Sequence, residues 1–228
     1  MDVPPLPPID VTIAIIIVTF FAVGLHEYAH CKMADAAGDP TPGVYGRVTL
    51  NLTKHFEPMG TIMMFFTAIA GVGIGWGRAA PMDPNKMRNP RWDFFIAVIA
   101  GPLSNILQAG VWAILFRMTA MWAPDLLLGS AFLENLLFFG IMLNLRMAFF
   151  NLIPLGPLDG HWLLGLLIPE KPRYYWFRFN RMYGQYGLIA LILISQMLAR
   201  NGGPNFLGTL INPPVEFLFR LFTGIKDG

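Results

Sequence analysis

The sequence predicts an all-α protein, a polytopic bundle of transmembrane helices with about five to six membrane segments. Of its 228 residues, 55% are hydrophobic and only 13% are charged, whereas an average soluble domain carries about 25% charge. Apolar stretches recur along the chain, and several approach the roughly 20 residues that a helix needs to cross a bilayer. This length suits one membrane-embedded domain over residues 1–228, with a core at about 11–168 and C-terminal helices at about 183–224.

Six apolar segments follow one another along the chain. They cover residues 11–33, 61–76, 94–121, 132–153, 186–198 and 206–222. The second is short and interrupted by Gly71, Gly73 and Gly75, so it either crosses the membrane or re-enters on the side where it began. The sixth contains Pro213 and Pro214, which fits a kinked span or a helix lying at the interface.

The connections between these segments differ in charge. Lys and Arg occur in residues 32–57, 77–93 and 170–181, whereas residues 119–130 contain neither. The positive-inside rule therefore places the first three connections in the cytoplasm and the fourth outside. We expect an integral protein of the cell (inner) membrane. Its net charge of +2 is too small to indicate nucleic acid as a partner.

Residues 26–30 read His-Glu-Tyr-Ala-His, an H-E-x-x-H pattern at the end of the first apolar segment. On a helix, residues i and i+4 lie about 40° apart around the axis and about 6 Å apart along it. Both imidazoles can therefore bind one metal ion, and Glu27 can take a proton from metal-bound water. The alternative is a helix end at the interface, where these side chains meet lipid headgroups.

A catalytic zinc takes three protein ligands and leaves one position for water. The single cysteine, Cys31, excludes a site built from several thiolates, so the third ligand is sought among His55, His161 and Asp159. Asp159 ends a stretch in which two prolines break the fourth apolar segment. Its spacing fits a ligand and equally an N-cap of the next helix. His55 is expected to be a solvated loop histidine, and His161 a substitute ligand or a partner of a ligand.

Three motifs, in this order along the chain, resemble the signatures of the site-2 protease family of intramembrane zinc metalloproteases. They are His-Glu-Tyr-Ala-His at 26–30, Ala-Gly-Pro-Leu-Ser-Asn at 100–105 and the segment 151–160. Further segments are similar to the compact bacterial and archaeal branch of that family, namely 38–42, 46–51, 58–61 and 75–82. The resemblance covers about residues 25–160 and is far more specific than the first motif alone.

The resemblance implies that His26, His30 and Asp159 hold one zinc ion per chain and that Glu27 is the general base. It implies an intramembrane metalloprotease that hydrolyses peptide bonds in or near transmembrane helices of membrane-protein substrates. The partners expected are a substrate helix and the lipid bilayer, with the active site opening toward the cytoplasm. Segments 71–81 and 154–157 are candidates for holding an unwound substrate by strand addition.

Two asparagines, Asn105 and Asn151, match family positions that line the catalytic cleft, where an amide could hold the substrate backbone or the oxyanion. The alternative for each is a hydrogen bond between helices. The sequence departs from the family pattern at Leu52, at residues 56–57 and 79–80, and at Arg146 within the fourth apolar segment. These departures put substrate specificity in doubt more than the metal centre.

The competing interpretation is a membrane protein without catalysis, in which the zinc is structural or the polar cluster lines a transport path. A transporter would be expected to show repeat symmetry, and the sequence shows no repeat. A structural zinc would need a fourth protein ligand. An open coordination position beside the metal would therefore distinguish a protease from a structural site.

Overall fold

The computed structural model describes residues 7–70 and 77–225, with the side chains of residues 67–70 left undescribed. This part of the chain is helical and holds no strand, which confirms the all-α prediction. Its longer helices are α1 (Ile9–Ala36), α3 (Pro58–Ala70), α4 (Trp92–Trp122), α6 (Ala131–Asn151), α8 (Glu170–Phe179), α9 (Gln185–Arg200) and α10 (Phe206–Thr223). Shorter elements are α2 (Thr41–Val44), η1 (Leu52–His55), η2 (Pro84–Lys86), α5 (Pro124–Gly129), α7 (Asp159–Leu167) and η3 (Asn180–Gly184).

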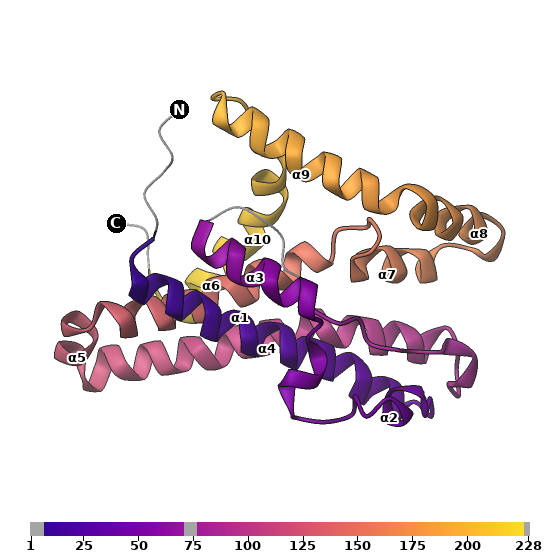
Figure 1. Ribbon diagram of the computed structural model, residues 1–228, viewed down its shortest axis with the longest axis horizontal. Coiled ribbons are helices and arrows are strands. Elements are labelled where there is room, and N and C mark those ends of the chain that lie inside the picture. Colours follow the sequence, from indigo (N-terminus) through magenta and orange to yellow (C-terminus); the bar gives the residue numbers. More distant parts are fainter. Residues whose placement is uncertain (1–6, 71–76, 226–228) are drawn as a thin grey trace.

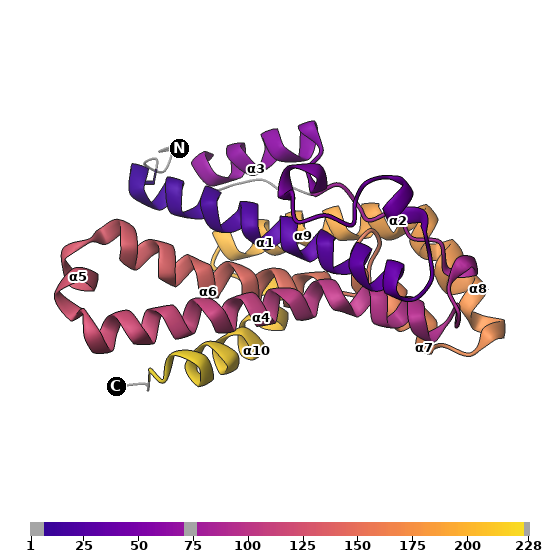
Figure 2. The same cartoon turned by 90° about the horizontal axis from the view of Figure 1, so that it is seen from below.

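The helices α1, α4 and α6 pack side by side as the core of the bundle (Figures 1 and 2). Their buried faces include small residues: Ala14 and Ala22 of α1 and Ala97, Ala109 and Ala113 of α4 are at most 1% exposed. Small side chains let helix backbones approach closely, which is how helices associate in lipid, where hydrophobic burial gives little driving force.

Four helices of the described chain are long and apolar enough to cross a membrane, namely α1, α4, α6 and the continuous helix Glu170–Arg200. Neither α3 nor α10 is among them, and the count of five to six segments stays a prediction. Whether residues 61–76 span or re-enter is also open, because residues 71–76 lie outside the described part. α10 runs through Pro213 and Pro214 as one helix and packs against α6 and α4.

The C-terminal helices begin earlier than predicted. Residues 170–181 were expected to form a loop, and the C-terminal helices were expected to start at about residue 183, but a helix begins at Glu170. The acidic residue in its first turn and Pro172, which needs no hydrogen-bond partner there, are favourable at a helix N-terminus. This helix runs through the π-helical turn η3 into α9 without a break.

The connections lie at the two ends of the bundle in the pattern that their charges suggest. The elements α2 and α8, from Lys- and Arg-bearing segments, lie at one end, and α5 lies at the other (Figure 1). At the α2 end, the short helix α7 packs against both α4 and α8. Because Asp159 is the first residue of α7, this packing brings a carboxylate to the buried polar face of α1.

Candidate metal centre

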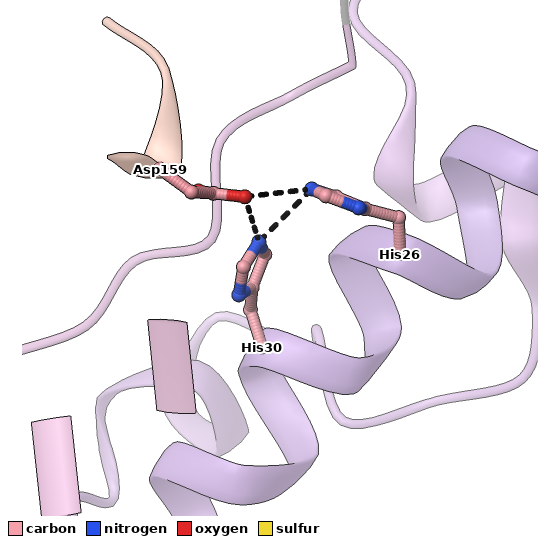
Figure 3. A group of neighbouring side chains, drawn as sticks. All are labelled: His26, His30 and Asp159. Atoms are coloured by element: carbon pink, nitrogen blue, oxygen red, sulfur yellow. Dashed lines mark hydrogen bonds and ion pairs between the residues drawn. The ribbon is translucent and has the colours of Figure 1, made fainter. Parts of the chain in front are cut away.

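Two imidazoles and one carboxylate converge inside the bundle. His26 and His30 of α1 are each 3% exposed, and their Nε2 atoms lie 3.1 Å apart. The Oδ2 atom of Asp159 lies 3.3 Å from Nε2 of His26 and 3.5 Å from Nε2 of His30 (Figure 3). One potential ligand atom from each residue thus lies within 4.8 Å of the others, although Asp159 is more than 120 residues further along the chain.

The other ring nitrogen of each histidine has a partner of its own. Nδ1 of His30 lies 2.8 Å from the backbone oxygen of Ala97, which can only accept, so Nδ1 carries the proton. Nδ1 of His26 lies 2.7 Å from Oδ1 of Asn105. In the neutral rings both Nε2 atoms therefore present lone pairs toward each other and toward Asp159.

This arrangement fits a divalent cation. Two facing lone pairs repel, and Oδ2 of Asp159 is buried with no hydrogen bond from any residue that the structure describes, which is costly for an anionic oxygen. A cation among the three atoms would relieve both conditions. Two imidazoles and one carboxylate also form a donor set of catalytic zinc sites, which leaves a position for water. The residues present therefore fit the zinc ion that the sequence predicts.

The side chain of Asp159 does not act as a helix cap. The N-cap of α7 is Leu158, with no side-chain hydrogen bond to the helix, and the Asp159 carboxylate faces the histidines instead. Of the two roles that its spacing allowed, the geometry favours the ligand.

The Asn105 side chain of α4 is fully buried and bonds to the two other core helices, α1 and α6. Its Oδ1 accepts from His26, and its Nδ2 donates to the backbone oxygen of Ala22 at 3.1 Å and to Oδ1 of Asn144 at 3.0 Å. The amide is thus committed to the helices, which corresponds to the interhelical alternative rather than to a cleft position. Its contact with His26 was not foreseen from the sequence.

Asn151 is half-buried at the end of α6. Its Nδ2 donates to the backbone oxygen of Met147 in its own helix at 3.0 Å. Arg146, one turn earlier, is exposed on α6. Neither residue belongs to the cluster of potential ligands.

Gly101 of α4 lies directly against both imidazoles. A Cβ atom at this position would overlap Nε2 and Cε1 of His30 and would lie 2.7 Å from Cε1 of His26. Such distances are far below van der Waals contact, so no larger residue fits beside these two side chains without moving them. Gly101 belongs to the second sequence motif, residues 100–105, but only the structure shows that it contacts the histidines.

Glu27 lies between the two histidines in sequence and faces the segment that follows residue 76. Its Oε2 is buried and has no hydrogen-bond partner in residues 7–70 and 77–225. A Cβ at Gly77 would lie 3.2 Å from its Cγ and Oε1. Buried polar groups nearly always have a partner. With one carboxylate oxygen free of partners among the described residues, Glu27 is suited to bind a water molecule and to take its proton.

The expectation that His55 is solvated is wrong, because the residue is fully buried. Its Nε2 donates to the backbone oxygen of Thr49 at 3.0 Å, and its Nδ1 accepts from Nε of Arg47 at 3.4 Å. The loop after α2 folds back onto α1, which removes the ring from solvent. His55 belongs to a loop anchor and not to the cluster of potential ligands.

His161 also lies outside the cluster of potential ligands. Its Nδ1 donates to the backbone oxygen of Leu158, and its ring packs on Trp162 and Phe177. Burial lowers the pKa of this imidazole. The ring is therefore held neutral among aromatic side chains.

Comparisons with known proteins identify similar proteins that are named zinc metalloproteases. The profile of peptidase family M50 matches residues 123–195. The chain is 29% identical over 219 residues to “Putative zinc metalloprotease YwhC” of Bacillus subtilis (strain 168), covering 96% of this chain and 94% of that protein. It is 30% identical over 171 residues to “Putative zinc metalloprotease Rip2” of Mycolicibacterium smegmatis, covering 74% of this chain and 63% of that protein. No solved structure gives a significant match.

Proposed function

The chain belongs to peptidase family M50, the site-2 protease family of zinc metalloproteases, and we propose that it hydrolyses peptide bonds in or near the transmembrane helices of other membrane proteins. The observation that carries this proposal is the convergence of His26, His30 and Asp159 among apolar helices. The neighbouring Glu27 adds a buried Oε2 that has no hydrogen-bond partner in the described part of the chain. These three residues would hold one zinc ion per chain.

The division of roles follows from the chemistry of each group. When bound, zinc supplies a Lewis acid that lowers the pKa of water to about 7 and polarises a substrate carbonyl. Glu27 takes a proton from the attacking water and returns it to the leaving nitrogen. Asn105 and the backbone oxygen of Ala97 keep Nε2 of each histidine turned toward the centre.

The substrate has to reach this site in an extended form, because a helix shields its own peptide groups by internal hydrogen bonds. We assign this task to the Gly- and Pro-rich stretches 77–81 and 154–157, and to Asn151, which precedes the second stretch in the sequence. Residues 71–76 of the first predicted stretch lie outside the described part. The charge distribution of the connections supports an opening toward the cytoplasm.

The test is the Glu27→Gln variant of the full chain, purified in detergent and given a model transmembrane substrate. Zinc, measured by elemental analysis, should stay at about one per chain, while cleavage falls by about 10²–10⁴-fold, the contribution of a general base. The matched control is Glu134→Gln, an exposed residue at the first turn of α6, which should cleave as the wild type does. Full activity of Glu27→Gln would refute the assignment of the base.

A companion variant tests the ligands. Asp159→Ala should lower the zinc content, because only two protein ligands remain. An unchanged zinc stoichiometry would show that the metal is held elsewhere, and the proposed site would then be wrong even if the protein were a protease.

A further inference from the structure

The helix Glu170–Arg200 holds the turn that precedes Asp159. Asn180 of this helix is 4% exposed, and its Oδ1 accepts a hydrogen bond of 2.8 Å from the backbone N–H of Gly156. Its Nδ2 donates to the backbone oxygen of Trp176, one turn earlier, at 3.2 Å. Gly156 is buried, so without Asn180 its N–H would lose its partner in a place that water does not reach readily.

A second bond joins the same helix to the other side of Asp159. Nε1 of Trp176 donates to the backbone oxygen of His161 at 2.7 Å. One helix therefore binds the chain three residues before Asp159 and again two residues after it. Figure 1 shows the two segments, α7 and α8, lying together at the same end of the bundle.

The local geometry of the helix makes this contact close. Residues Asn180–Gly184 form a π-helical turn, a rare feature that is frequent at functional sites. A Cβ at Gly184 would lie 2.8 Å from the backbone nitrogen of Gly156 and 3.0 Å from Oδ1 of Asn180. The absence of a side chain at Gly184 thus lets the helix backbone approach the turn at Gly156.

We propose that Asn180 is a positioning residue for the metal centre, because it fixes the turn from which Asp159 reaches His26 and His30. This rests on the proposed function, in which these three side chains hold the zinc. The other hydrogen bonds of the turn are local, from the Leu155 N–H to the Ile153 oxygen and from the Leu158 N–H to the Leu155 oxygen. Asn180 instead links the turn to a separate helix. The metal geometry then depends on a helix outside the α1–α4–α6 core.

The test uses cobalt as a spectroscopic substitute for zinc in the full chain in detergent. The variants are Asn180→Leu, which removes the acceptor, and Asn180→Asp, which keeps an oxygen for the Gly156 N–H. Asn201→Leu is the matched control, because Asn201 makes the same type of bond to a carbonyl one turn earlier, 2.9 Å to Met197, at an exposed site. Two quantities are measured: the visible cobalt spectrum and the zinc affinity in competition with a chelator.

Asn180→Leu should weaken zinc binding by about 10–100-fold, the usual effect of losing a residue that orients a ligand. Its cobalt spectrum should shift toward that of Asp159→Ala. Asn180→Asp should recover most of the affinity, and Asn201→Leu should match the wild type in both measurements. An unchanged affinity and spectrum in Asn180→Leu would overturn the proposal, and so would equal losses in the Leu and Asp variants, because the acceptor would then not matter.

If Asn180→Leu does not fold, Trp176→Phe tests the same relationship from the other side, since it keeps the ring but removes the donor to His161. It should weaken zinc binding by a smaller factor, and an unchanged affinity would then overturn the proposal. The Asp159→Ala reference separates the two possible failures. An Asp159→Ala spectrum equal to that of the wild type would refute the ligand set itself. A changed Asp159→Ala spectrum beside an unchanged Asn180→Leu spectrum would refute only the role of Asn180.

Discussion

The Nδ1 atom of His26 lies 2.7 Å from the side-chain oxygen of Asn105, although the two residues are 79 positions apart. Asn105 in turn donates to Ala22 of α1 and to Asn144 of α6. The orientation of one potential metal ligand is therefore fixed by an amide that joins all three core helices. Partners of this kind set the tautomer and direction of a metal-binding imidazole.

Replacing Asn105 should weaken the metal centre without removing a ligand. Asn105→Leu leaves Nδ1 of His26 without an acceptor, so the ring can turn, and zinc affinity should fall by about 10–100-fold. Asn105→Asp keeps an oxygen for His26 and should bind zinc more tightly than the Leu variant. The measurement is competition with a chelator. Equal affinities of wild type and Asn105→Leu would show that His26 is oriented by other contacts.

Gly101 should be irreplaceable beside the histidines. Gly101→Ala would place a methyl group on the Nε2 edge of His30, so we expect zinc content well below one per chain. Gly110→Ala is the control on the same helix, since a Cβ there meets nothing within 4 Å. It should keep its zinc and even gain slight stability, because alanine favours helices by about 1 kcal/mol over glycine. Similar zinc contents in the two variants would contradict this reading of the contact.

The parts of the site that the sequence predicted are the local ones. His26, Glu27 and His30 share two turns of one helix, so their spacing alone determines how they lie. Asp159 was different, because its spacing fitted a cap as well as a ligand, and only the resemblance to a family favoured the ligand. The tertiary contact that turns its carboxylate to the histidines is not encoded in any short pattern.

The features that the sequence did not predict correctly also depend on tertiary contacts or on local geometry without a sequence pattern. His55 was expected in solvent because loops usually are, but a short loop beside a membrane helix can bury its polar groups on that helix. Residues 170–181, rich in charge and aromatic side chains, suited a loop at the interface as well as the helix that forms there. Asn180 carried no signal, since a π-helical turn has no spacing that distinguishes it from an ordinary helix.

Asp39 should stabilise the protein in a pH-dependent way. It is fully buried after α1, and its two oxygens accept from the backbone N–H groups of Asp83 at 2.7 Å and Thr41 at 2.9 Å. Burial opposes ionisation, but these donors hold the pKa of Asp39 below its ordinary 3.8. The stabilisation is therefore present above about pH 4 and is lost as the pH falls through the lower folded-state pKa.

The variant Asp39→Asn should lower the free energy of unfolding at pH 7 by about 1.5–3 kcal/mol, the range for hydrogen bonds to a charged group. It should also flatten the loss of stability below pH 4. Denaturant unfolding in detergent between pH 7 and pH 3 measures both effects. Asp35→Asn is the control, since Asp35 forms only a solvent-accessible pair with Lys32 at 3.8 Å and should cost at most about 1 kcal/mol. Equal losses of unfolding free energy in the two variants would show that the hydrogen bonds to the buried Asp39 carboxylate do not stabilise the protein.

His55 should make the loop after α2 sensitive to mild acid. Burial and the nearby Arg47 cation lower the pKa of His55 below its ordinary 6.5, against the opposing effect of the Thr49 carbonyl. The unfolded chain then takes up a proton at a higher pH than the folded chain does, so stability decreases as the pH falls below about 6.5. Once protonated, Nδ1 of His55 could no longer accept the hydrogen bond from Arg47. Arg47 also donates to the carbonyl of Arg78, the residue after Gly77.

The variant His55→Gln tests this linkage, because a neutral amide can donate to Thr49 and accept from Arg47 at every pH. Melting temperatures of the wild type and the variant, measured between pH 8 and pH 5, should diverge in the variant's favour as the pH falls. The buried His161 titrates alike in both proteins, so its contribution cancels in the difference. A difference between the two melting temperatures that stays constant across this range would mean that His55 keeps its ordinary pKa in the folded protein.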